Sequence, residues 1–123
     1  MSDKRLAVRK NPFGLKTSVL ENIADIVKRH PQVEKAILFG SRAKGTHHPG
    51  SDVDIALKGD SLNLAQLNQI QLELDDLPLP YTFDICIYHR IDNPDLRRHI
   101  QRVGKILYQR GRASSHSTAP GKK

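Results

Sequence analysis

The stretch from Ile37 to Leu57, ILFGSRAKGTHHPGSDVDIAL, constrains the fold of this chain more than any other segment. It joins two short apolar runs through a loop that contains three glycines and two histidines. Each run has the length of a strand rather than of a helix. The second run carries Asp52 and Asp54, and alternate side chains of a strand share a face. We therefore expect two carboxylates side by side on one face of a sheet, while Val53 and Ile55 point into the core.

The rest of the chain supplies helices and further strands around this pair. Apolar residues recur at helical spacing in two segments and alternate with polar ones in a third. Thr17 or Ser18 is expected to cap the first helix, and Ser61 or Asn63 the second. The pattern predicts an α/β (α+β) domain, a small mixed β-sheet flanked by helices. The expected helices are 15–30, 62–77 and 93–103, and the expected strands are 33–39, 52–57, 81–88 and 105–108.

The net charge of +7 lies at the two ends of the 123-residue chain. The first 16 residues carry five basic side chains and one acid, residues 109–123 carry four basic side chains and no acid, and the segment between them has a net charge of −1. We expect a basic N-terminal arm over 1–14, one domain over 15–108 and a disordered basic tail over 109–123. Charged termini are usually solvated, and contact with nucleic acid is the alternative.

The cysteine content and the apolar runs bear on the compartment. The single cysteine, Cys86, excludes an internal disulfide. The N-terminal sequence MSDKRLAVRK lacks the apolar core of a signal peptide, and no apolar run reaches membrane-spanning length. We expect a soluble, cytoplasmic protein with no membrane partner.

A third carboxylate favours a metal site. Asp84 lies in the middle of the expected strand 81–88, on the face opposite Phe83 and Ile85. Close carboxylates repel each other unless a cation lies between them, and hard oxygen ligands favour Mg²⁺. If this strand pairs beside 52–57, three carboxylates converge, as a two-metal phosphoryl-transfer site requires. The alternative for Asp84 is an exposed polar residue on a half-solvated sheet.

The Gly40-Ser41 pair offers a place for phosphate. A strand is expected to end just before Gly40, which allows a tight turn. Backbone N–H groups at such a corner can hold phosphate, and the Ser41 hydroxyl can add a hydrogen bond. Arg42 and Lys44 follow at positions suited to balance phosphate charge. An ordinary Gly-Ser turn is the alternative, because short motifs often occur by chance.

Together these residues resemble the signature of the DNA polymerase β-like nucleotidyltransferase superfamily. The signature consists here of Gly40-Ser41, ten intervening residues, Asp52-x-Asp54 and the later Asp84. Three flanking residues also agree: Arg42, Gly45 and Ser51. The resemblance covers residues 15–108. By its size the chain is similar to the minimal nucleotidyltransferases (MNT), antitoxins that are paired with HEPN toxins in prokaryotes.

The resemblance implies a polymerase β-like fold and Mg²⁺-dependent transfer of AMP from ATP to a tyrosine hydroxyl of a HEPN toxin. Asp52 and Asp54 would bind two Mg²⁺ ions. Asp84 would complete the metal site and act as general base. The nucleotide-binding residues implied are Gly40, Ser41, Arg42, Lys44 and Ser51.

Two other functions remain open at this point. The chain could neutralise its toxin by contact alone, with nucleotide as a structural ligand. It could instead be a nucleotidyltransferase that acts on RNA or a small molecule, as the basic ends would favour. His47 and His48 are expected to be solvated loop residues, and His99 is expected to serve packing.

Overall fold

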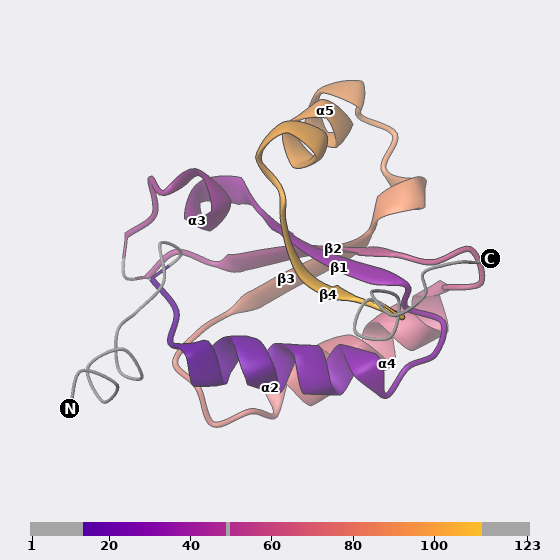
Figure 1. Cartoon of the computed structure of the whole chain (residues 1–123), viewed down its shortest axis with the longest axis horizontal. Coiled ribbons are helices and arrows are strands. Elements are labelled where there is room, and N and C mark those ends of the chain that lie inside the picture. The colour runs from indigo at the N-terminus through magenta and orange to yellow at the C-terminus, as the bar shows by residue number, and fades with distance from the viewer. Residues whose placement is uncertain (1–13, 49, 112–123) are drawn as a thin grey trace.

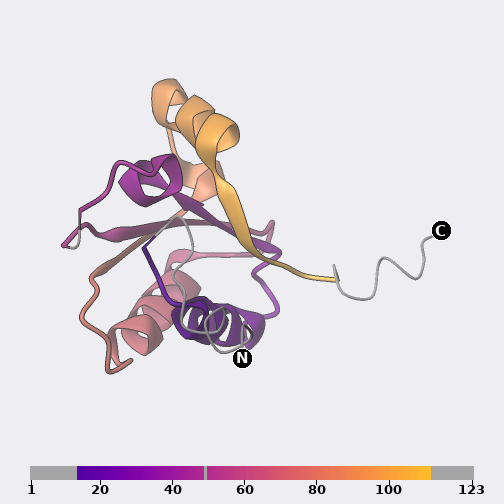
Figure 2. The same ribbon diagram turned by 60° about the vertical axis from the view of Figure 1, so that its left-hand side comes forward.

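The structure of the protein, a computed structural model, describes residues 14–48 and 50–111. Three layers are visible, with a four-stranded sheet in the middle and a pair of helices on each face (Figures 1 and 2). The arm predicted over 1–14 and the tail predicted over 109–123 lie outside the described residues, apart from Gly14 and residues 109–111. No helix of the described ranges is long and apolar enough to cross a membrane.

All seven predicted elements are present, with ends that differ by a few residues. The helices are α2 (Thr17–Lys28), α4 (Leu64–Asp75) and α5 (Pro94–Val103), and the strands are β1 (Lys35–Phe39), β2 (Val53–Lys58), β3 (Phe83–Ile87) and β4 (Lys105–Gln109). Two short elements were not predicted: the helix α3 (Gly40–Lys44) and the 3-10 turn η1 (Tyr88–Arg90). The predicted α/β class and mixed sheet are confirmed.

The helix caps agree with the sequence in one of two cases. Asn63 caps α4, and its side chain accepts a hydrogen bond from the Gln66 N–H while the Gln66 side chain accepts one from the Asn63 N–H. This reciprocal pair is a capping box. The cap expected for α2 at Thr17 or Ser18 is wrong, because the N-cap position is Lys16, which makes no side-chain cap bond.

The sheet has the strand order β3-β2-β1-β4. The strand β1 is antiparallel to β2 and to β4, whereas β2 and β3 are parallel and are connected through α4. In this register Asp54 lies beside Phe39 on one side and beside Asp84 on the other. The pairing of β3 with β2, on which the convergence of the carboxylates depends, is therefore present.

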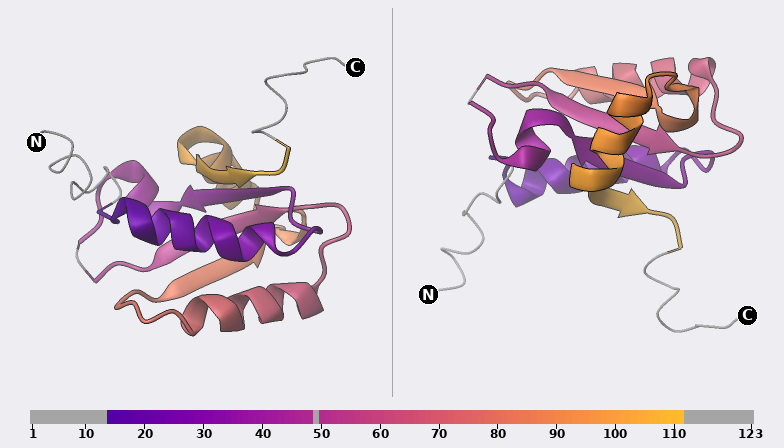
Figure 3. Two further views of the ribbon diagram at one scale, coloured as in Figure 1. Left: turned by 60° about the horizontal axis from the view of Figure 1, so that its bottom comes forward. Right: turned by 90° about the horizontal axis from the view of Figure 1, so that it is seen from above.

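The main core lies between the sheet and the helices α2 and α4, which run in front of the sheet in the left view of Figure 3. Alternation along β2 decides which side chains enter it. Val53, Ile55 and Leu57 are fully buried on this face, together with Ile23 of α2 and Ile70 of α4. The even-numbered residues of β2, including Asp54, consequently face the other layer.

The opposite face of the sheet is only partly covered. The helices α3 and α5 lie next to each other over it, as the right view of Figure 3 shows. A small apolar cluster of Ile37, Ala56, Tyr88 and Ile100 fills the space beneath α5. The ends of β2 and β3 that carry the aspartates extend beyond this cluster, which leaves their side chains accessible.

Candidate active site

Three aspartates converge at one end of the sheet. Asp54 is near the start of β2, Asp84 is its neighbour on β3, and Asp52 comes immediately before β2. One carboxylate oxygen from each residue lies within 4.8 Å of those of the other two. Asp52 and Asp84 are exposed and Asp54 is half-buried. The convergence that the sequence made conditional on the pairing of these two strands is therefore present, while the catalytic roles of the three residues stay predictions.

The electrostatics of this cluster suit a cation. Burial, together with the smaller effects of the neighbouring negative charges of Asp84 and Asp52, raises the pKa of Asp54 to about 6. A carboxylate in this position is costly to ionise without a compensating positive charge. Three hard oxygen donors in close proximity fit Mg²⁺. The donor set is thus suitable for the predicted ion.

The Gly40-Ser41 turn lies directly against the carboxylates. Gly40 has a φ of +77°, in the left-handed region that favours glycine. A Cβ atom at this position would overlap the Oδ2 atom of Asp54. Both the backbone conformation and the space therefore require glycine here. The first turn of α3 starts at this residue, so the backbone of the predicted phosphate site adjoins the predicted metal site.

Arg42 occupies a different position from the one expected of a phosphate ligand. Its side chain is 1% exposed, and its Nε and Nη2 atoms donate hydrogen bonds to the Ser51 carbonyl at 3.2 and 3.0 Å. The guanidinium group also lies over the Tyr81 ring, 5.3 Å from its centre. Arg42 thereby fixes the residue that precedes Asp52. Its contact with nucleotide stays a prediction.

The other predicted nucleotide ligands lie around the same loop. The Ser51 Oγ atom accepts a hydrogen bond of 2.9 Å from the His48 N–H, which closes the end of the loop. Lys44 is exposed in the last turn of α3, and Ser41 is half-buried in its first. His48 is exposed, as expected for a solvated loop residue, whereas His47 is half-buried. The structure brings Gly40, Ser41 and Ser51 close to the aspartates through α3 and this loop.

Comparison with known proteins identifies the family. The family model described as "Polymerase beta, Nucleotidyltransferase" matches residues 21–113. The chain belongs to this family. The match contains the Gly40-Ser41 turn and all three aspartates, and it makes the chain a nucleotidyltransferase by class. No curated protein matches the chain.

Solved structures of toxin–antitoxin pairs share the fold of this polymerase β-type nucleotidyltransferase. A toxin–antitoxin crystal structure with AMP-PNP is 23% identical, with a TM-score of 0.62, and the match covers 79% of this chain and 78% of that one. An MntA–HpeT toxin–antitoxin mutant with two aspartate-to-glutamate changes is 21% identical, with the same TM-score and coverage. An MntA–HepT toxin–antitoxin is 18% identical, with a TM-score of 0.59 and coverage of 82% and 79%. The predicted polymerase β-like fold is confirmed.

One residue of the nucleotidyltransferase site was not recognised in the sequence. His99 of α5 accepts a hydrogen bond of 3.1 Å at its Nε2 atom from the N–H of Gly40. Its ring also meets Phe39 edge-on, with 6.2 Å between the ring centres. Burial lowers the pKa of His99, and the charges of Lys44 and Arg102 lower it further. The neutral imidazole is thus favoured, which is the form that can accept this bond.

We expect His99→Leu to lower the free energy of unfolding by about 1–3 kcal/mol, because the Gly40 N–H loses its acceptor. The contribution should depend on pH. Since the folded pKa lies below 6.5, the unfolded chain binds the proton first, and the wild type loses stability as the pH falls below 6.5. Denaturant unfolding at several pH values between 7.5 and 5.5 measures both effects.

The comparison is best made in an Asp54→Asn background. Asp54 titrates within the same pH range, and its effect on stability has the opposite sign, because its protonation stabilises the folded state. His99→Gln is the control variant, since its amide oxygen can accept the bond but does not titrate. Two results together would contradict a stabilising bond from the Gly40 N–H to His99. The leucine and glutamine variants would be equally stable at pH 7.5, and both would keep the pH dependence of stability that the Asp54→Asn protein shows.

Cys86 shares the sheet face of Asp84 and is half-buried. Burial, together with the smaller effects of the negative charges of Asp84 and Asp54, raises the pKa of its thiol to about 11. The thiol is therefore protonated at neutral pH, which does not favour a role as a nucleophile.

Proposed function

We propose that this chain transfers AMP from ATP to a tyrosine hydroxyl of a HEPN-type toxin and thereby acts as its antitoxin. The observation that carries the proposal is the convergence of Asp52, Asp54 and Asp84 beside the Gly40 turn. The toxin–antitoxin structures that share the fold, one of them with AMP-PNP, support the choice of partner and nucleotide. The cytoplasmic location expected from the sequence is part of the proposal, because ATP is supplied there.

The aspartates have distinct tasks in this reaction. Asp52 and Asp54 would hold two Mg²⁺ ions, with Asp84 completing the set. When bound, the ions neutralise the phosphate charge and polarise the α-phosphorus. Gly40 and Ser41 would hold the triphosphate: the tight turn at Gly40, whose own N–H is bonded to His99, would let the backbone approach it, and Ser41 would donate its N–H and hydroxyl.

Asp84 would accept the proton of the acceptor hydroxyl, a role that its exposure and its position beside Asp54 support. The acceptor oxygen forms a bond to the α-phosphorus as the bond to the β-phosphate oxygen breaks. Pyrophosphate leaves, and the hydroxyl proton passes to the carboxylate. Arg42 contributes indirectly by fixing Ser51 and hence Asp52.

The exposure of the site is compatible with a protein acceptor. Asp52 and Asp84 are accessible at the end of the sheet, so a tyrosine on another protein can approach without entering a closed pocket. The domain is small and the sheet face is only partly covered, so the partner would supply much of the binding surface for its own tyrosine. This favours a protein acceptor over a small molecule, which binds in a concave site.

The test uses ATP labelled at the α-phosphate, Mg²⁺, the purified protein and lysate of the source cell. We expect label on one protein band with the wild type and none with Asp52→Asn. Asp76→Asn, which removes one exposed carboxylate at the end of α4, is the matched control and should label normally. Sequencing of the labelled band then identifies the partner and the modified tyrosine.

Two outcomes would replace the proposal. Label on RNA or a small molecule, with none on protein, would indicate a different acceptor. No label anywhere, together with a co-purifying toxin that Asp52→Asn still neutralises, would indicate an antitoxin that acts by contact alone. Each of these results excludes protein adenylylation as the function.

A further inference from the structure

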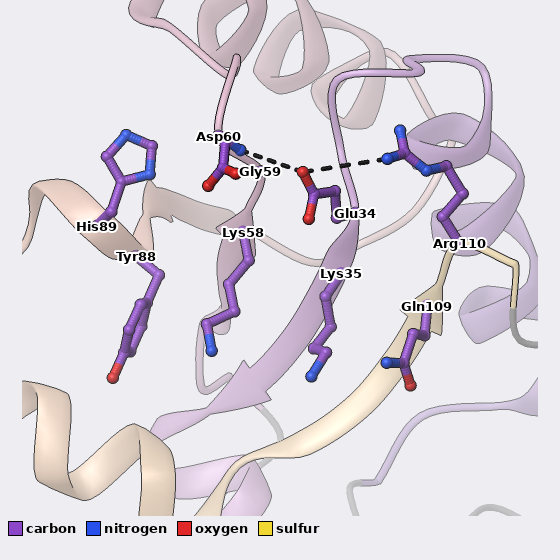
Figure 4. A pocket seen from close by; sticks show the side chains of 9 residues that line it. All are labelled: Glu34, Lys35, Lys58, Gly59, Asp60, Tyr88, His89, Gln109 and Arg110. Atoms are coloured by element: carbon purple, nitrogen blue, oxygen red, sulfur yellow. Dashed lines mark hydrogen bonds and ion pairs between the residues drawn. The ribbon is translucent and has the colours of Figure 1, made fainter. Parts of the chain in front are cut away.

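A hollow lies at the opposite end of the sheet from the aspartates. It has a volume of about 430 Å³, within the range of small-molecule sites. Its lining comes from the start of β1, the end of β2, η1 and the end of β4 (Figure 4). Lys58 is four residues along β2 from Asp54 and on the same face, so the two sites are roughly 13 Å apart along the strand. The hollow is thus separate from the metal-binding residues.

Two lysines form the centre of this hollow. Lys35 and Lys58 are direct cross-strand partners in the antiparallel pair of β1 and β2. Both are half-buried, and neither forms an ion pair within the described residues. Like charges directly opposite each other destabilise a sheet. An arrangement that costs stability in the free protein is explained if an anion lies between the two ammonium groups.

Neighbouring groups add positive charge and hydrogen-bond donors. The Lys58 Nζ atom lies 4.5 Å from the centre of the Tyr88 ring, and the Arg97 guanidinium lies 4.8 Å from the same centre. Gln109 is the partner of Lys35 on the other side, in β4, and its side chain also lines the hollow. Because Tyr88 is buried and already contacts two cations, its ring is not free to stack on a nucleobase.

The acidic residues of the hollow are directed elsewhere. The Glu34 Oε2 atom accepts a hydrogen bond of 3.2 Å from the Asp60 N–H and lies 4.0 Å from the Arg110 guanidinium. Figure 4 shows the carboxylates of Glu34 and Asp60 at one end of the hollow and the amino groups of Lys35 and Lys58 at the other. The lysine end is therefore positive even though the lining as a whole contains both signs.

We propose that Lys35 and Lys58 bind a small phosphate-class anion, orthophosphate or pyrophosphate, at a site distinct from the catalytic aspartates. Lysine binds phosphate as a point charge, and a tetrahedral group with several oxygens can accept from two ammonium groups at once. A carboxylate ligand is less suited, because carboxylates bind best to the two parallel N–H groups of an arginine. The arginine of this hollow, Arg110, already contacts Glu34 and the Pro31 carbonyl.

The test measures thermal stability and anion affinity without Mg²⁺, ATP or a partner, so that its result does not depend on the proposed transfer reaction. Sodium orthophosphate and sodium pyrophosphate are titrated at constant ionic strength, with sodium chloride as the reference. We expect a concentration-dependent rise in Tm with at least one of the two phosphates. The double variant Lys35→Gln/Lys58→Gln should bind phosphate at least about tenfold more weakly, since hydrogen bonds to charged groups are stronger than those between neutral groups.

The double variant also provides a signature that a purely structural role would not give. Without phosphate its Tm should equal or exceed that of the wild type, because the like-charge pair is removed. Lys28→Gln, an exposed lysine of α2 on the other face, and Asp54→Asn should both keep the phosphate response.

Three results would overturn the proposal. The first is a wild-type Tm that phosphate raises no more than chloride does. The second is a phosphate response that survives in the double variant. The third is binding of single-stranded RNA through the two lysines with no response to either small anion, which would make the surface a nucleic-acid contact.

Discussion

Asp54→Asn is expected to reduce nucleotidyl transfer by about a hundredfold to a thousandfold and, at the same time, to stabilise the metal-free protein. The loss of activity follows because the central carboxylate of the proposed metal site is removed, and a single electrostatic stabiliser of a transition state contributes about 10²–10³ in rate. Single-turnover labelling with α-labelled ATP measures the first effect. Thermal or denaturant unfolding without Mg²⁺ measures the second.

The gain in stability follows from the sign of the pKa shift. The folded pKa of about 6 lies above the ordinary value of 3.8, so the folded state binds the proton more tightly than the unfolded chain does. The ionised carboxylate therefore destabilises the fold above pH 6, and this cost disappears as the pH falls toward 4. After allowance for solvent screening we expect a gain of about 1–2 kcal/mol for the asparagine variant at pH 7.

Magnesium should make the wild type more stable than Asp54→Asn, the reverse of the order expected without metal. The ion stabilises the wild type in proportion to its binding, whereas the asparagine variant lacks the central ligand. The effect of Mg²⁺ on the wild-type Tm should be larger at pH 7.5 than at pH 5.5, where Asp54 is mostly protonated. Asp76→Asn controls for the loss of one exposed carboxylate. If Asp54→Asn were less stable than the wild type without metal and remained active, the three aspartates would not form the proposed site.

The sheet face of each aspartate could be predicted because it rests on local patterns, whereas the convergence of the three was conditional on the pairing of their strands. Alternation in a strand fixes the face of Asp54, and the same rule fixes that of Asp84. The remaining requirement was that β3 pair beside β2. Two strands connected through a helix usually form a parallel pair with a right-handed connection, and a helix was predicted over 62–77, between these two strands. The spacing of the motif also indicated the nucleotidyltransferase family, and the match to the family model confirmed it.

The role of Arg42 could not be predicted, because it depends on how the loop closes. A basic residue after a Gly-Ser turn is expected to be near phosphate, and nothing local indicates burial. The guanidinium group donates hydrogen bonds to the Ser51 carbonyl, nine residues along the chain. It also lies over the ring of Tyr81, which belongs to a distant segment. A fully buried arginine requires such partners, and only the tertiary fold supplies them.

His99 and α3 were missed for related reasons. The bond from the Gly40 N–H to His99 joins residues 59 positions apart, so no sequence pattern marks it. The helix α3 has five residues, which is too short for a hydrophobic periodicity to be recognised. The missing α2 cap has a different cause: Thr17 and Ser18 are good capping residues, but the helix begins one residue earlier than a Thr17 cap allows.

Gly40→Ala is expected to separate the activity of the site from its stability. An alanine at a φ of +77° costs about 1–2 kcal/mol of folding free energy. Its Cβ atom would also overlap the Asp54 Oδ2 atom, and the short aspartate side chain can rotate away at little further cost to the fold. The carboxylate then leaves its place in the cluster. A displacement of about 1 Å at a reacting centre can lower the rate about a hundredfold, and we expect a loss of this size in the labelling assay.

Gly45→Ala is the matched control for this prediction. Gly45 ends α3 with a φ of +82°, and a Cβ atom there would meet no atom of the described residues within 4 Å. The two alanine variants should therefore lose similar stability, as measured by denaturant unfolding, because both carry the same backbone strain. Only Gly40→Ala should lose most of its activity and its response to Mg²⁺. Equal activity in the two variants would show that the position of the Asp54 carboxylate does not limit the reaction, since the backbone strain is common to both and the overlap with Asp54 is not.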